Sequence, residues 1–132
     1  MGFNEKVHAF IAAKFYVYLT EAFGERGERA FIHGTQYYAE QRGRRMAQRA
    51  IRDGKELTYA NYLEYGEWVN TQEIIDEGCA NKSTIESWAP DYRIHITMCP
   101  WYTQFKEMGL PDAGHVYCAH LDNSICLSLI HI

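Results

Sequence analysis

Two cysteines and one aspartate in the last third of the chain have the residue types that nucleophilic catalysis requires. Cys99 directly precedes Pro100, and Cys118 lies four residues before Asp122. A thiolate attacks an electron-poor carbon when its surroundings lower its pKa, and a helix opened by Pro100 would favour a thiolate at Cys99. We predict Cys99 or Cys118 as nucleophile and Asp122 as general base or water-positioning group. The alternative is that both cysteines are small buried hydrophobic residues.

Histidines near these residues suggest other chemistry. His115, Cys118 and Asp122 are spaced three and four residues apart, so they share one face of a predicted helix. With Cys99 they would form a mixed metal-ligand set. The chain lacks the Cys-x-x-Cys pairs typical of such sites, however, and we expect no metal and no other cofactor. His95 shares a strand face with Cys99, but four residues at about 3.3 Å each separate their Cα atoms by about 13 Å, too far for a direct pair.

A basic run at positions 42–45 offers groups that bind a carboxylate, because the guanidinium fork matches the two oxygens of that anion. The alternative is a solvated helix face with ion pairs inside the helix. The residues that we predict to bind substrate are Arg42, Arg45, Trp101, His115 and Tyr117.

The N-terminal residues predict a long first helix. Asn4 suits an N-cap, the helix runs to about Phe23, and Gly24 ends it. His8, on this helix, receives no role. Apolar residues at helical spacing predict its buried face, which consists of Val7, Ile11, Phe15, Tyr18 and Ala22.

A second helix is predicted at about 28–53, with a narrow apolar stripe of mostly small residues that includes Ala39, Gly43 and Ala47. Glycine inside a helix costs about 1 kcal/mol relative to alanine. Close approach of another backbone at Gly43 would offset that cost. The arginines of this helix are expected on the side that faces away from the stripe.

The remaining segments predict a hairpin framed by short helices. Alternating residues predict two antiparallel strands that meet at the turn signal Pro90-Asp91. Thr71 either caps a short helix or lies in an irregular segment. We therefore expect an α+β fold with N-terminal helices packed on a small antiparallel sheet, which is incomplete because the C-terminal part is missing. An isolated hairpin is only marginally stable, so we expect the missing part to supply more strands. The expected helices are 58–65, 101–108 and 113–124, and the expected strands are 84–89 and 92–99.

Composition limits the class of protein. The 132 residues fit one domain, and 47 % hydrophobic with 23 % charged residues is a normal globular balance. A net charge of −4 argues against a general nucleic-acid or membrane-surface binder. Four cysteines without a preceding secretory signal predict a cytoplasmic protein with reduced thiols. The expected partner is a small-molecule substrate, and the sequence does not determine the oligomeric state.

The last six residues, Leu-Ser-Leu-Ile-His-Ile, differ in character from what precedes them. They are what the DNA string CTGTCTCTTATACACATC encodes, which is the end of a common transposase-based sequencing adapter. We therefore expect a single domain at 1–126, lacking its natural C-terminal part, with residues 127–132 as an artefact of translation. A natural apolar C-terminal strand is the alternative.

The order and spacing of several motifs resemble the L-2-amino-thiazoline-4-carboxylic acid hydrolase family. In that family a strand ends in Cys-Pro, a short helix and a glycine follow, and a further helix carries Tyr-Cys and an aspartate. The basic segment at 42–47 is similar to the family's N-terminal half. The matching residues here are Cys99-Pro100-Trp101, Phe105, Gly109-Leu110, Tyr117-Cys118 and Asp122.

This resemblance implies a hydrolase for carbon–nitrogen bonds other than peptide bonds. The family's founding reaction opens a 2-amino-thiazoline-4-carboxylate ring to give an N-carbamoyl cysteine. We expect a protein that hydrolyses a small carboxylated heterocycle or amide. The alternative is a small-ligand-binding or sensor domain without catalysis.

Overall fold

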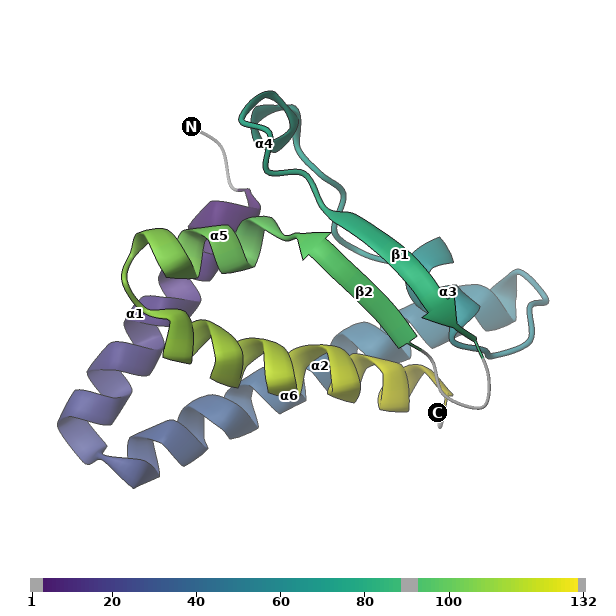
Figure 1. Cartoon of the computed structure of the whole chain (residues 1–132). Coiled ribbons are helices and arrows are strands. Elements are labelled where there is room, and N and C mark those ends of the chain that lie inside the picture. Colours follow the sequence, from purple (N-terminus) through teal and green to yellow (C-terminus); the bar gives the residue numbers. More distant parts are fainter. Residues whose placement is uncertain (1–3, 89–92, 131–132) are drawn as a thin grey trace.

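The computed structural model describes residues 4–88 and 93–130 and has six helices and a hairpin in these ranges (Figure 1). The predicted turn at Pro90-Asp91 lies outside the described residues. None of the described helices has both the length and the apolar character needed to cross a lipid bilayer. In chain order the elements are α1 (Glu5–Phe23), α2 (Glu25–Arg52), α3 (Ala60–Glu64), α4 (Gln72–Asp76), β1 (Lys82–Ser87), β2 (Arg93–Met98), α5 (Pro100–Glu107) and α6 (Pro111–Ile130).

The first two helices are joined by a single glycine. The side chain of Asn4 accepts a hydrogen bond from the backbone N–H of Val7, which confirms the predicted N-cap of α1. Gly24 adopts a φ of 57°, a conformation that glycine tolerates best, and α2 begins at the next residue, three residues earlier than predicted. Gly27 lies inside α2. This position requires glycine, because a Cβ atom there would come within 1.9 Å of the Leu19 carbonyl oxygen.

The predicted buried face of α1 is wrong. Phe15 and Tyr18 are 62 % and 65 % exposed, and the fully buried apolar residues of this helix are instead Ala9 and Ala13. The side of α1 that faces α2, α5 and α6 is lined by alanines, because small side chains let these helices approach closely. Phe10, Phe15 and Tyr18 lie on the exposed side.

The principal core lies between α2 and α6, which cross at Gly43. A Cβ atom at Gly43 would lie 2.4 Å from the carbonyl oxygen of Ile125 and 3.0 Å from the backbone nitrogen of Leu129. The predicted close approach of a second backbone is thereby confirmed, and α6 is its source. The core residues around this crossing include Ala39, Met46, Ala47, Leu121, Ile125 and Leu129.

The strands β1 and β2 form an antiparallel hairpin in which Thr84 pairs with His95 and Ile85 with Ile94. The α+β class is confirmed, and the hairpin lies to one side of the helices, alongside α6 (Figure 1). Helix α6 extends six residues beyond the Ser124 end that we predicted, to Ile130.

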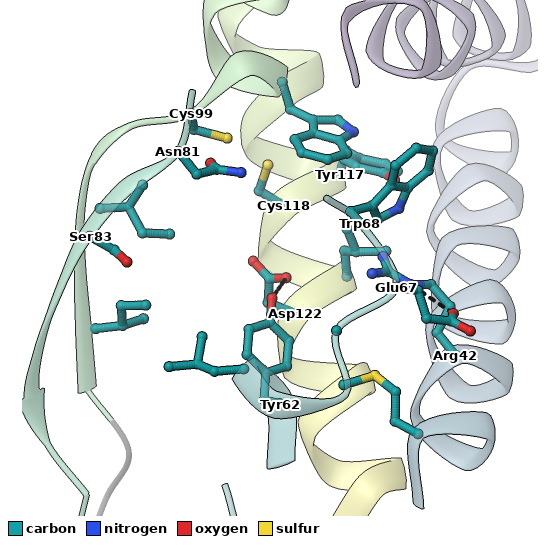
Figure 2. A pocket seen from close by; sticks show the side chains of 17 residues that line it. Arg42, Tyr62, Glu67, Trp68, Asn81, Ser83, Cys99, Tyr117, Cys118 and Asp122 are labelled. Atoms are coloured by element: carbon teal, nitrogen blue, oxygen red, sulfur yellow. Dashed lines mark hydrogen bonds and ion pairs between the residues drawn. The ribbon is translucent and has the colours of Figure 1, made fainter. Parts of the chain in front are cut away.

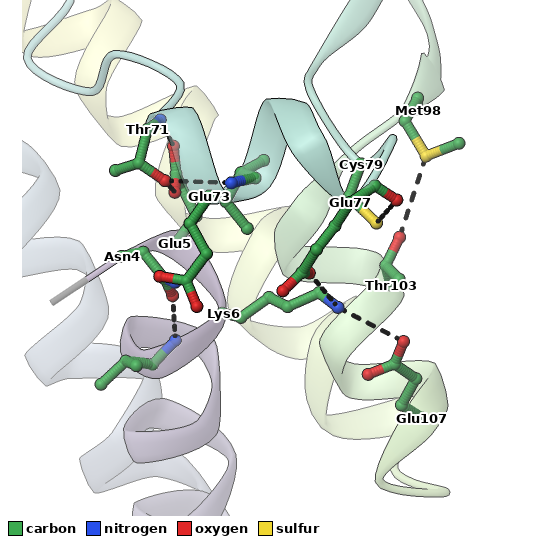
Figure 3. Close-up of polar contacts among 12 residues, drawn as sticks. Asn4, Glu5, Lys6, Thr71, Glu73, Glu77, Cys79, Met98, Thr103 and Glu107 are labelled. Carbon is green, nitrogen blue, oxygen red and sulfur yellow. Dashed lines mark hydrogen bonds and ion pairs between the residues drawn. The ribbon is translucent and has the colours of Figure 1, made fainter. Parts of the chain in front are cut away.

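The first turn of α1 binds the segment that precedes the hairpin (Figure 3). The buried carboxylate of Glu5 accepts hydrogen bonds from the backbone N–H and the hydroxyl of Thr71, both at 3.3 Å, and Asn4 donates to Glu73 at 2.9 Å. Thr71 in turn caps α4, which resolves the alternatives left open for this segment. Lys6 adds an ion pair to Glu77 at 3.0 Å. These contacts fix the chain that leads to β1.

We expect Gly43→Ala to destabilise the protein by about 1–3 kcal/mol, because the added methyl group meets backbone atoms that cannot rotate away. Gly34→Ala is the matched control in the same helix, since a Cβ atom there has no neighbour within 4 Å. The control should stabilise the protein by about 0.5–1 kcal/mol through helix propensity alone. Urea unfolding followed by circular dichroism measures both changes, and equal effects of the two substitutions would contradict the close approach.

Candidate functional site

A cavity of about 230 Å³ lies between α2, α6, the beginning of α5, the chain around Glu67 and the inner side of the hairpin (Figure 2). The lining residues are distant in sequence. Cys99 lies between the end of β2 and the beginning of α5, and Tyr117, Cys118 and Asp122 lie on α6. The sequence-predicted site residues that line it are Arg42, Cys99, Trp101, Tyr117, Cys118 and Asp122.

Both predicted cysteine nucleophiles are half-buried, and their thiol groups point into the same hollow (Figure 2). Burial raises the pKa of Cys99, although backbone N–H groups of Tyr102 and Trp101 at the beginning of α5 act in the opposite direction. Burial raises the pKa of Cys118 to about 12, and the charges of Asp122 and Cys99 add to this effect. The expected influence of the helix N-terminus at Cys99 is therefore present, but burial outweighs it.

Asp122 lies one helical turn after Cys118 and faces the same cavity. Burial raises the pKa of its carboxyl group, while a hydrogen bond from the Tyr62 hydroxyl at 2.8 Å and the positive charge of Arg42 act in the opposite direction. A carboxyl group with a raised pKa in a partly closed cavity is suited to accept a proton and return it.

Arg42 is only 6 % exposed, so the expectation that it faces away from the core is wrong. Its Nε atom lies 3.4 Å from a carboxylate oxygen of Glu67 but is buried without a hydrogen-bond partner among the described residues. Glu67 instead accepts two hydrogen bonds from Arg45, at 2.7 and 2.8 Å, and one from Arg49 at 3.3 Å. Three arginines around one carboxylate leave an excess of positive charge beside the cavity.

Two of the predicted binding residues do not reach the cavity. Arg45 has a half-exposed side chain that pairs with Glu67 from outside, and His115 is exposed on α6. His115 and Cys118 lie on the same helix at the predicted spacing, but the side chain of His115 is exposed to solvent and does not line the cavity. Among the described residues, no group of three histidines, cysteines or carboxylates lies close enough to hold a metal ion.

Sequence reasoning missed Glu67 and Trp68, which line the cavity from an irregular segment without periodicity. It also missed His8, whose Nε2 atom lies 2.8 Å from the Tyr117 hydroxyl. Burial, and secondarily the charge of Arg42, lower the pKa of His8. The sequence signal that could have indicated a buried role for His8 is its position among the apolar residues of α1.

Trp101, like Arg42, lines the cavity and has a buried hydrogen-bond donor without an acceptor among the described residues. Trp101 is 9 % exposed, and its indole N–H is buried without a hydrogen-bond acceptor within the part of the chain that the structure describes. Buried donors are nearly always paired in folded proteins. Arg42 and Trp101, which both line the cavity, thus each carry a buried donor that lacks an acceptor among the described residues.

Comparison with known proteins identifies the family of this chain. The family model of L-2-amino-thiazoline-4-carboxylic acid hydrolase matches residues 4–128, nearly the entire chain. No curated protein and no solved structure matches it. The matched range contains every residue that lines the cavity, and the chain belongs to the L-2-amino-thiazoline-4-carboxylic acid hydrolase family.

Proposed function

We propose that the protein is a hydrolase for a small carboxylated heterocycle or amide, and that its specific reaction is the opening of a 2-amino-thiazoline-4-carboxylate ring. The observation that carries this proposal is a buried arginine in the same cavity as two thiols and a carboxyl group, with an Nε atom that lacks a hydrogen-bond acceptor among the described residues. The family name gives the reaction class.

Arg42 is the group that binds the substrate carboxylate in this proposal. Glu67 is already shared with Arg45 and Arg49, so Arg42 keeps enough positive charge to attract an anion. A carboxylate oxygen can also accept a hydrogen bond from the Nε–H group of Arg42. This bond removes the free-energy cost of burying a donor without an acceptor. The walls of the cavity exclude part of the solvent and strengthen this attraction.

Cys99 is the favoured nucleophile, because only its thiolate is stabilised by backbone N–H groups at the beginning of a helix. Asp122 takes the thiol proton as sulfur attacks the amidine carbon, and the ring C–S bond breaks. The departing ring sulfur receives that proton back from Asp122. Water then attacks the same carbon, Asp122 accepts a proton from it, and the Cys99 thiolate leaves and is reprotonated. The product is a urea, as in an N-carbamoyl cysteine.

The raised thiol pKa values favour a second candidate function, a ligand-binding domain without catalysis. Protonated thiols would then only line a pocket for a carboxylated ligand. Incubation with 2-amino-thiazoline-4-carboxylate followed by mass spectrometry separates the two functions. Recovery of the bound ligand unchanged after long incubation supports the binding domain, whereas appearance of the carbamoyl product supports the hydrolase.

We expect Cys99→Ser to lower kcat by about 1,000-fold or more, because loss of a covalent nucleophile removes the main reaction path. Cys118→Ser is the matched control in the same cavity and should lower kcat far less, since its thiol stays protonated. Rates of product formation at saturating substrate measure both effects. Equal and small losses in the two variants would remove the thiol mechanism.

Arg42→Met should raise KM for a carboxylated substrate by roughly 10- to 100-fold, because a hydrogen bond to a charged group contributes about 1.5–3 kcal/mol. Arg44→Met, at an exposed neighbour on the same helix, is the control and should leave KM unchanged. Steady-state kinetics on correctly folded variants, checked by circular dichroism, give the comparison. A KM that responds equally to both substitutions would exclude Arg42 as the carboxylate-binding group.

Asp122→Asn should stabilise the protein at neutral pH while it lowers turnover about 100-fold or more. The folded pKa of Asp122 lies above its unfolded value, so this group favours folding most at low pH, and its contribution is lost as the pH rises through the folded pKa. The gain in urea midpoint should therefore be present at pH 7 and vanish near about pH 3, where the carboxyl is protonated in both states. A variant that is less stable than the wild type at pH 7 would contradict this assignment.

A further inference from the structure

A second hollow of about 300 Å³ adjoins the cavity just described. The two hollows share Tyr62, Ile94, Ile96 and Asp122, so they lie side by side in the groove between the hairpin and α6. The hydrogen-bonded pair Tyr62–Asp122 lies at the boundary between them. Figure 2 shows this pair at the opposite end of the first cavity from Cys99.

The two ends of this groove differ in polarity. The first end contains Arg42 and the excess positive charge around Glu67. The described lining of the second end contains no cationic side chain, and burial with the nearby charge of Asp122 raises the pKa of Cys126 to about 11, which keeps its thiol neutral. Ile96 is 48 % exposed on the inner side of the hairpin, so the groove offers apolar surface that no described side chain covers fully.

The hairpin leaves this surface open because it contacts the helices only sparsely. The strands β1 and β2 pack chiefly on one another, whereas α6 packs on α2 from the other side. An apolar strand face above a helix, directly beside a charged cavity, matches a ligand that is charged at one end and apolar at the other. A small unsubstituted thiazoline would occupy the first cavity alone.

We propose that the substrate is an amphipathic carboxylate whose apolar substituent lies along Ile94 and Ile96, beyond the Tyr62–Asp122 pair. This inference rests on the proposed function for the orientation of the ligand. With the carboxylate at Arg42 and the reacting carbon between Cys99 and Asp122, the exocyclic nitrogen of a 2-amino-thiazoline points away from Arg42. A substituent on that nitrogen therefore enters the second hollow.

The test compares 2-amino-thiazoline-4-carboxylate with its N-butyl derivative, using calorimetry for Kd and mass spectrometry for turnover. Each methylene that leaves water strengthens binding about fourfold, so the butyl compound should bind at least about tenfold more tightly. Asn123→Trp narrows the second hollow from an exposed position on α6 and should abolish this gain. Ala119→Trp, also exposed on α6 but outside both hollows, should preserve it.

The outcomes separate this inference from the proposed function. If the parent compound binds and is hydrolysed but the butyl group adds no affinity, the apolar subsite is overturned and the hydrolase stands. If the butyl group adds affinity that Asn123→Trp abolishes, and neither compound is hydrolysed, the subsite stands and the hydrolase is overturned. A gain that survives Asn123→Trp, or the absence of binding by both compounds, overturns the subsite.

Discussion

The close contact of α2 with α6 at Gly43 is the constraint on which the rest of the structure depends. With a hydrogen atom in place of a side chain, the backbone of α6 comes near enough to make the core of Met46, Ala47 and Ile125 continuous. The same approach sets Arg42, the residue before Gly43, in a cavity lined by residues of α6. A helix that stood further away would leave this guanidinium in water, where its attraction for an anion would be weaker.

Burial is the dominant electrostatic influence in the cavity. It raises the pKa of Cys99, Cys118 and Asp122, so each of these groups favours its neutral form. A nearby positive charge or a proton acceptor would make their ionisation easier. The site therefore places mostly neutral thiols beside a positively charged arginine. A substrate that carries its own charged groups would change this balance on binding, so the proposed chemistry couples ionisation of the site to its occupation.

The sequence predicted the helix ends well where capping chemistry defines them, as at Asn4 and Gly24. It also predicted the two thiols and the carboxyl group of the cavity, because the Cys-Pro and Tyr-Cys motifs are local signals on two helices that meet there. It failed for the face of α1, since apolar spacing shows which residues lie together and not which side is covered. It failed for Glu67 and Trp68 because an irregular segment has no period from which a direction could be inferred.

The hydrogen bonds of Glu5 and Asn4 to Thr71 and Glu73 connect the first turn of α1 to the segment that joins two lining stretches of the cavity, at Glu67 and at Asn81. Terminal helical turns ordinarily fray, opening and closing independently of the remaining fold. Because α4 is bonded to that first turn, opening of the turn should release α4 and the segment between Glu67 and Asn81 with it. Backbone amides of the first turn of α1 and of the segment between Glu67 and Asn81 should thus exchange with solvent deuterium as one cooperative unit. The shape of the cavity then depends on the stability of the amino-terminal turn.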